Sequence, residues 1–436
     1  MRASLLPALL LPLLAMPLAA QDKESFRLDN GIRVVVAENH SAPLCSAVLV
    51  CPLTADAGAS DYAGAALLSR LIWGGGRGFG VAVREHEYRM IALRFGGSVG
   101  SQLAADALLI HYTLPPELLP SVFAYMALQM STIEIGPERF EAAREAVAGE
   151  ERAALASSVL AQLLREIELR LWSDLPYCLR SLGSGEALAT ADTEAVRAAL
   201  RRLQNPGSWT LVVTGDVSRA DVETALADTL AMIRPDCQPD SQSPITETES
   251  GREPQLGLLL RLPAELSRRH AVVAFRLPPA AAADEAGLLL LSEYLRRSPA
   301  LRDLRRELGD EEPVDVSVGL DRRRLGGMLY LYAAWRSDFA AEQVAVRLGE
   351  LAAAVAEDGP ETAAMEAARS ALLIRYWTRR MAVQPYALWL GLRVAAGDDL
   401  GDLPARLEGL EGEDLRRLAG ELLSPGNRLS LITVER

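Results

Sequence analysis

Residues 26–39 read FRLDNGIRVVVAEN, two strand-like runs on either side of Asn30-Gly31. Asn-Gly is the dipeptide preferred in tight β-hairpin turns, because both residues tolerate a positive φ. A further β-run from Ala47 to Val50 follows. The stretch therefore predicts that the folded part of the chain begins with a hairpin and a third strand.

Helical and strand patterns then alternate along the chain. GAALLSRLIWGGG, residues 64–76, is typical of a helix face followed by a glycine loop, and we expect GGGRGFG (74–80) and REHEY (84–88) to be loops. One long helix is predicted from Pro137 to about Trp172, since proline is favoured in a first helical turn. SWTLVVTGDV (208–217) predicts a strand.

The composition changes between residues 234 and 255, where RPDCQPDSQSPITETESGREPQ has almost no apolar content and predicts a linker. After it a similar order of strands and helices begins again, which suggests an internal duplication. We therefore predict an α+β fold of two homologous domains, residues 21–233 and 256–436. Each is expected to be a mostly antiparallel sheet packed with helices.

The first twenty residues predict a secretory signal peptide, with Arg2, an apolar run and small residues at Ala19 and Ala20. The alternative is a membrane anchor, but the run is short and interrupted by Pro7, Pro12 and Pro17. We thus expect cleavage near Ala20, no membrane anchor afterwards, and a periplasmic or secreted protein. The formal net charge of -13 argues against nucleic acid as a partner.

Cysteines and histidines give no metal or nucleophile motif. Cys45 and Cys51 lie about 20 Å apart along one predicted strand, beyond disulfide reach, and are expected to be buried free thiols. Cys178 and Cys237 could bridge, and the sequence leaves this open. The four histidines have no metal-ligand spacing. No cofactor is therefore expected.

The order of five passages resembles the short, processing-peptidase-like form of the insulinase/pitrilysin-like metallopeptidases. They are the hairpin region, the Gly-Gly segment with its strands, the Pro-Tyr stretch, a strand that closes the first domain, and the start of a substrate-facing segment, at residues 28–50, 92–119, 175–188, 203–217 and 298–309. The resemblance implies an insulinase-type fold across nearly the whole chain after residue 20.

The same resemblance implies where a zinc site would lie. The family carries His-x-x-Glu-His on a helix, and a distant Glu supplies the third protein ligand. This chain has Ala66, Ser69 and Arg70 at the three motif positions, and Glu150 is nearest the distant one. The zinc motif is therefore degenerate, and we expect no metal site and no catalytic residue. Arg70 is a possible partner of Glu150.

The family also holds substrate with an Arg and a Tyr. Arg305 stands at the Arg position and is our candidate substrate-binding residue, with pairing to a nearby Glu as the alternative, whereas Glu312 replaces the Tyr. We expect a chain that is not an enzyme on its own. As a partner of a catalytic chain of the same family, or of a second copy, it would help to form a chamber for unfolded peptides. The alternatives are an active peptidase with an atypical site and a scaffold subunit of a larger complex.

Overall fold

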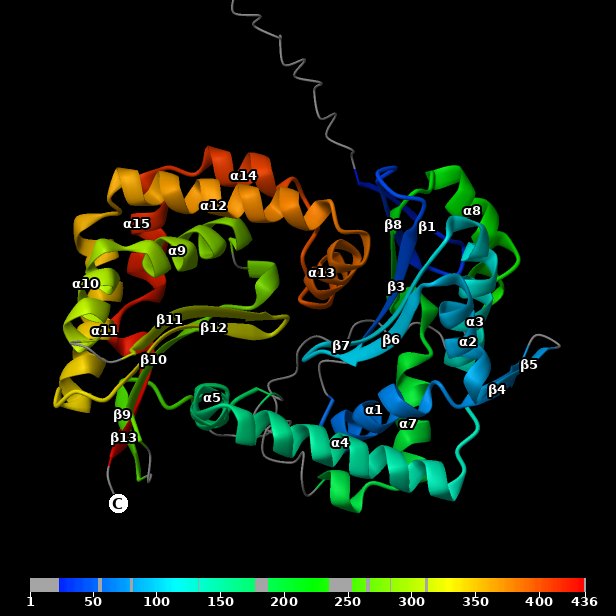
Figure 1. Ribbon diagram of the computed structural model, residues 1–436, viewed down its shortest axis with the longest axis horizontal. Coiled ribbons are helices and arrows are strands. Elements are labelled where there is room, and N and C mark those ends of the chain that lie inside the picture. Colours follow the sequence, from blue (N-terminus) through cyan, green and yellow to red (C-terminus); the bar gives the residue numbers. More distant parts are fainter. Residues whose placement is uncertain are drawn as a thin grey trace, which may run out of the picture.

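The computed structural model describes the chain over residues 23–53, 57–78, 81–131, 133–175, 177, 187–234, 253–263, 267–282, 284–309 and 313–434. The predicted signal peptide, nearly all of the predicted linker, Cys178, Cys237 and Glu312 lie outside these residues. Two sheets stand on either side of a central gap between ribbons (Figure 1). None of the described helices is long and apolar enough to cross a membrane.

The first sheet has six strands. Their order across the sheet is β1 (Glu24–Arg27), β2 (Arg33–Glu38), β8 (Thr210–Gly215), β3 (Cys45–Pro52), β7 (Ala107–Leu114) and β6 (Ser98–Leu103). Only β2 and β8 run parallel, and the other neighbours are antiparallel. A separate antiparallel pair, β4 (Gly75–Gly78) and β5 (Val81–Arg84), projects from this half.

The second sheet has five strands, whose order matches that of the first sheet when it is read from the opposite edge, from β6 to β2. They are β11 (Asp315–Arg323), β12 (Gly326–Trp335), β10 (Arg269–Leu277), β13 (Arg428–Val434) and β9 (Leu258–Pro263). Here β9 and β13 form the one parallel pair, as β2 and β8 do in the first sheet. The predicted α+β fold of two homologous, mostly antiparallel units is therefore confirmed.

The helices also follow one order in both halves. The first half has α1 (Ala59–Leu71), α2 (Glu85–Phe95), α3 (Leu119–Ser131), α4 (Pro137–Ser157), α5 (Val159–Leu171), α7 (Thr193–Leu203) and α8 (Arg219–Ala227). The second has α9 (Glu285–Arg297), α10 (Pro299–Gly309), α11 (Ala341–Asp358), α12 (Thr362–Arg380), α13 (Val383–Ala395), α14 (Leu403–Gly409) and α15 (Gly412–Leu422). By position in this order, and by their mutual contact, the pair α9–α12 corresponds to α1–α4.

Each sheet is covered on one face by its own helices and on the other by a helix from the opposite half. Helix α5 packs on β10 and β13, whereas α13 packs on β3 and β8 (Figure 1). Strand β3 shows the consequence, since Leu49 faces the helices of its own half while Val48 and Val50 face Leu390 of α13. Both faces of β3 are apolar because both are buried.

A buried network of charges fixes α13 to the second half. Arg393 on α13 donates to Glu285 at the start of α9 over 2.7 Å and also contacts Asp398 at 3.3 Å. Arg322 on β11 pairs with Asp398 at 2.5 Å and with Glu285 at 3.1 Å. Two carboxylates and two guanidiniums thus neutralise one another where water is excluded.

The expected hairpin forms, but its turn has three residues and not two. Leu28 donates to the Ile32 carbonyl over 2.9 Å, which leaves a loop of Asp29, Asn30 and Gly31. Gly31 has φ +91°, and a Cβ there would meet the Gly207 backbone at 2.8 Å. Only glycine fits this turn without strain.

The predicted single helix from Pro137 to Trp172 is wrong, because it breaks at Ser158. Ser158 is extended (φ -147°, ψ 116°), and its side chain accepts a hydrogen bond from the Ala161 amide as the N-cap of α5. A serine can compete for backbone hydrogen bonds in this way and so begin a new helix. The break turns α5 towards the second sheet.

The two predicted loops after Trp73 are also ordered elements. Gly75 to Gly78 pair with Val81 to Arg84 as β4 and β5, and residues 85–95 form α2. The Glu87 carboxylate accepts from the Arg84 amide over 2.8 Å and so caps α2. Cys45 and Cys51, by contrast, are buried free thiols as predicted.

Candidate functional site

The degenerate motif positions lie on α1 and do not offer metal ligands. The Ser69 hydroxyl donates to the Ala66 carbonyl over 2.6 Å, and the Ser69 carbonyl accepts from the Ser101 hydroxyl of β6 over 2.5 Å. Ala66 has no ligand atom. The Ser101 hydroxyl in turn accepts from the Trp73 indole over 2.8 Å, so these contacts fix α1 against the edge strand β6.

Arg70 and Glu150 form an ion pair between α1 and α4. Both side chains are partly exposed, at 43% and 60%. The neighbouring Glu151 turns instead to Arg165 of α5, at 3.0 Å. Of the two adjacent glutamates, only Glu150 therefore faces the motif positions on α1.

These residues do not fit a zinc ion. A guanidinium stands where the family's second histidine would coordinate, and it already occupies the carboxylate that could serve as third ligand. In the part of the chain that the structure describes, no cluster of three or more His, Cys, Asp or Glu side chains could hold a metal. The correspondence of these positions to the family's zinc motif rests on the sequence and stays a prediction.

The edge of the first sheet lies beside this pair. Strand β6 is the terminal strand of the sheet, and β7 is its neighbour on one side. Val99 and Leu103 pack towards the core, whereas Ser98 donates to the Gln384 side chain of α13 over 3.0 Å. An edge strand carries backbone groups that can pair with an added strand.

Arg305 does not point freely into solvent. It lies on α10, and its guanidinium donates to the Val316 carbonyl of β11. This contact holds α10 against the second sheet. Glu312, at the family's Tyr position, is outside the described residues, so the substrate-binding role of Arg305 stays a prediction.

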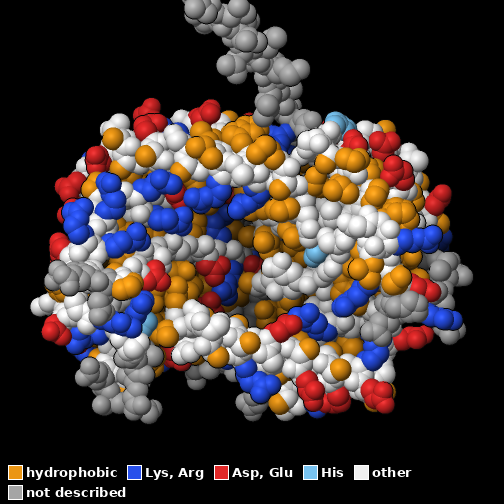
Figure 2. Space-filling view, viewed as in Figure 1, with side chains coloured by type: hydrophobic (Ala, Val, Ile, Leu, Met, Phe, Trp, Pro, Cys, Tyr) orange, Lys and Arg blue, Asp and Glu red, His pale blue; other side chains and the backbone are white. Residues whose placement is uncertain are grey.

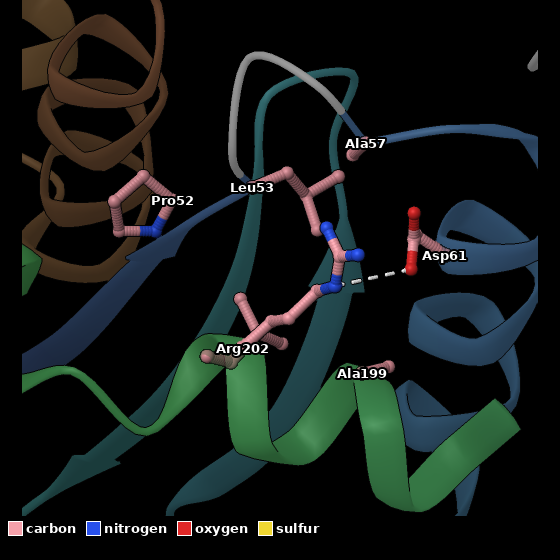
Figure 3. A pocket seen from close by; sticks show the side chains of 7 residues that line it. Pro52, Leu53, Ala57, Asp61, Ala199 and Arg202 are labelled. Carbon is pink, nitrogen blue, oxygen red and sulfur yellow. Dashed lines mark ion pairs between the residues drawn. The ribbon is translucent and has the colours of Figure 1, made fainter. Parts of the chain in front are cut away.

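One small cavity lies between α1 and α7 and is not a ligand site. It has a volume of about 10 Å³, close to the space that a single water needs. Figure 3 shows Leu53, Asp61 and Arg202 around it, with the Asp61 and Arg202 side chains 3.3 Å apart in an ion pair. These contacts join the two helices.

A larger groove lies in the second half, on the corresponding helix pair α9–α12 and the start of α13. Its volume is about 570 Å³, and its lining residues are Arg297, Ala371, Ile374, Arg375, Thr378, Arg379, Ala382 and Pro385. Lys and Arg side chains gather over α9 and α12 beside a hollow in the surface (Figure 2). None of the lining residues is acidic, so the groove is cationic although the chain as a whole is strongly acidic.

One buried carboxylate organises this groove. Glu293 of α9 is 1% exposed and pairs with Arg296 at 2.6 Å, Arg297 at 2.7 Å and Arg375 at 2.9 Å. Burial would raise the pKa of Glu293, but hydrogen bonds from Arg297 and Arg375 and the charge of Arg296 lower it overall. Glu293 therefore stays ionised and holds three guanidiniums with a single negative charge.

Arg379 adds a cation without a carboxylate partner among the described residues. Its guanidinium lies 5.2 Å from the centre of the Trp389 ring. Burial, with the adjacent charge of Arg375, lowers the pKa of Arg379. Sequence reasoning missed this groove: the spacing of Glu293, Arg296 and Arg297 was a visible signal, but the approach of Arg375 and Arg379 from α12 was not.

The fold is that of an α+β protein with two similar units, in which Ala66, Ser69 and Arg70 of α1 offer no set of metal ligands. Residues 190–372 match the family model described as peptidase M16 inactive domain. The resemblance to the insulinase/pitrilysin-like peptidases is thereby confirmed. No curated protein matches the sequence.

Solved structures share the fold at low sequence identity. A protease from Helicobacter pylori superposes with a TM-score of 0.81 at 15% identity, over 95% of this chain and 100% of that one. A peptidase M16 inactive domain from Pseudomonas fluorescens gives 0.71 at 15%, over 95% and 98%. The periplasmic protease PqqL from Escherichia coli gives 0.74 at 14%, over 96% of this chain but 46% of its own. At such identities the likeness shows the fold alone.

Proposed function

We propose that this chain is an exported, non-catalytic M16-like homologue that pairs with a zinc-containing chain of the same family and helps to form a peptide-binding chamber. The observation that carries the proposal is the Arg70–Glu150 ion pair. In this pair the Glu150 carboxylate is bound by the Arg70 guanidinium and needs no metal ion to balance its charge. A catalytic zinc site needs protein ligands and an open position, and this pair offers neither.

A partner role is supported by length. This chain superposes on 46% of the length of PqqL, so PqqL is about twice as long and contains this fold in part of its chain. Short members of the resembled family act as pairs, because one chain forms half of the chamber. A zinc-containing partner would supply the chemistry, and this chain would supply the facing wall.

Peptide binding is supported by the edge strand β6. An extended peptide can add to an exposed sheet edge through backbone hydrogen bonds, with little dependence on its side chains. The hydrogen bonds of Ser101 to Ser69 and Ser98 to Gln384 fix both faces of β6. A fixed edge is prepared for pairing without a further ordering step.

Export is the part of the proposal that rests on the sequence. The stretch from Met1 to Ala20 has the pattern of a signal peptide. A fusion of these residues to a reporter that is active only outside the cytoplasm tests the idea. Activity that persists after Arg2 and the apolar run are replaced by polar residues would contradict it.

Co-purification tests the partner role. We expect the chain, tagged at its C-terminus and isolated from its native host, to bring down a second chain with an intact His-x-x-Glu-His. The complex should cleave an unfolded peptide in a chelator-sensitive manner, and this chain alone should not. A chain that purifies alone and cleaves the peptide by itself would sink the proposal.

A further inference from the structure

We infer that the groove lined by Arg297, Arg375 and Arg379 binds the carboxylates of an acidic, extended peptide. The inference rests on the proposed peptide-binding function and adds the chemical class of the peptide. Its first support is charge: Arg296, Arg297 and Arg375 share Glu293 as their paired carboxylate, and Arg379 lines the same groove. Guanidiniums bind carboxylates through short, charge-assisted hydrogen bonds.

The arrangement of the cations favours a ligand over a purely internal role. Arg296 turns away to the Val318 carbonyl, at 3.0 Å. Arg297 and Arg375 remain 45% exposed in their side chains while Glu293 fixes one side of each guanidinium. A guanidinium held in this way has donors left over and loses little freedom when it binds an anion.

Arg379 is the second support. It faces the charge of Arg375 without a carboxylate of its own in the described part of the chain, and burial makes that repulsion more costly. Such an arrangement opposes folding. It becomes favourable when an anion enters between the two arginines.

The groove also has an apolar contact for the peptide. Ile374, one helical position before Arg375, is 67% exposed, and Ala371 lies one turn earlier on the same helix. A large exposed apolar side chain among cations suits a ligand that combines both characters. We therefore expect acidic residues interspersed with aliphatic ones.

The position of the groove joins it to the edge strand. Ala382 and Pro385 line its end, and Gln384 between them accepts the hydrogen bond from Ser98 at the start of β6. A peptide that adds to β6 would reach the cationic groove directly beyond Ser98. The Ser98–Gln384 hydrogen bond thus links the edge strand of the first half to the end of the groove in the second.

Fluorescence anisotropy with a matched pair of peptides tests the inference. The first is a labelled peptide of alternating Glu and Leu, and the second has Gln in place of every Glu. We expect the full chain to bind the Glu peptide at least about tenfold more tightly, since hydrogen bonds between charged groups are the stronger ones. The preference should fade as ionic strength rises.

Variants locate the site. Arg375→Gln with Arg379→Gln should abolish the preference for Glu, whereas Arg197→Gln with Arg201→Gln should keep it. The control removes the same charge from α7, where both arginines pair with Glu194. Arg379→Gln alone should leave the thermal midpoint unchanged or higher, because it relieves repulsion. A weaker preference for Glu in this single variant would then not be due to a loss of folding.

The outcomes separate the two proposals. Equal binding of both peptides, with amides of β6 protected from hydrogen exchange, would overturn the acidic preference and leave peptide binding intact. Failure of both peptides to bind would overturn both ideas. Tighter binding of a short oligothymidylate than of the Glu peptide would show a general polyanion site and would also overturn the inference.

Discussion

Arg70 on α1 donates to Glu150 on α4, across 80 positions of sequence. The corresponding helix pair in the second half is joined with the opposite polarity, because Glu293 lies on α9 and Arg375 on α12, 2.9 Å apart. The first pair neutralises its charges, whereas the second leaves an excess of cations. One duplicated framework thus presents two different surfaces.

The Arg70–Glu150 pair should contribute little to stability. Both side chains are partly exposed, and exposed ion pairs contribute about 0.2–1 kcal/mol. A double-mutant cycle with Arg70→Ala and Glu150→Ala, followed by urea unfolding, measures the coupling. A coupling above about 2 kcal/mol would mean that the pair is a structural element and not merely a replacement of ligands.

Restoring the motif should give only weak zinc binding. In the variant Ala66→His, Ser69→Glu and Arg70→His, Glu150 loses its guanidinium partner and becomes available as a ligand. Ser69, however, is buried and its carbonyl is tied to Ser101, so a glutamate there has little room to act as a base. We expect no chelator-sensitive cleavage of unfolded peptides by the isolated variant.

A fourth change provides the control. Adding Glu150→Gln to the restored motif should lower the zinc affinity further, as measured by competition with a chromophoric chelator. Unchanged affinity would show that Glu150 does not face the restored pair. Robust turnover by the triple variant would show that the chain is closer to an enzyme than we conclude.

The stability of the chain should fall in weak acid through His270. Burial, with the charge of Arg268, lowers the pKa of His270 from 6.5 to about 4. The unfolded chain then binds a proton that the folded chain does not, so the free energy of unfolding decreases as the pH falls from 6.5 to 4. The loss should be about 1–2 kcal/mol after allowance for solvent screening.

His270→Gln tests this assignment by urea unfolding at several pH values. The variant should be less stable at neutral pH, because it loses the 3.0 Å hydrogen bond between the His270 ring and the Tyr332 hydroxyl. Its stability should, however, decline less in acid. His40→Gln is the control, because hydrogen bonds to Asp216 and Glu38 raise the pKa of His40. An equal decline in wild type and His270→Gln would rule His270 out as the cause.

The two halves should stay together after the chain is cut between them. A specific protease site inserted between residues 235 and 252 should give two bands on a denaturing gel and one peak in size-exclusion chromatography. The reason is that α5 and α13 each cover the opposite sheet. The predicted domain bounds, 21–233 and 256–436, stay a prediction, and two fragments that elute and unfold separately would favour independent domains.

Leu390→Ala probes the same crossing in the uncut chain. Leu390 is fully buried against the first sheet, so its truncation should cost about 2–5 kcal/mol and lower the midpoint of a single unfolding transition. Leu392→Ala, on the same helix but 37% exposed, should cost much less. A separate transition for the second half alone would argue against interlocked halves.

Local sequence signals predicted the elements that depend on neighbouring residues. Asn30-Gly31 indicated the hairpin, and the repeated order of strands and helices indicated the duplicated α+β fold. The stretch that holds Ala66, Ser69 and Arg70 was predicted to be helical and forms α1. The opposite charges of Arg70 and Glu150, together with the family resemblance, indicated that the two could pair. These features depend on residue type and spacing, which a single sequence displays.

Long-range packing was not visible in the sequence. The apolar stripe of α5, with Leu163 and Ile167, predicts a buried helix but does not say that it covers the opposite sheet. The cationic groove likewise requires Arg375 and Arg379 of α12 to lie against α9. Arg375 and Glu293 are 82 residues apart in the sequence.

The zinc content of the purified chain tests the central claim most directly. Elemental analysis after mild dialysis, beside a zinc-containing peptidase of the same family treated identically, gives the ratio of metal to protein. We predict a ratio near zero for this chain, because Ala66, Ser69 and Arg70 provide no ligand set and Glu150 is paired. One tightly bound zinc ion per chain would contradict the account of a non-catalytic homologue.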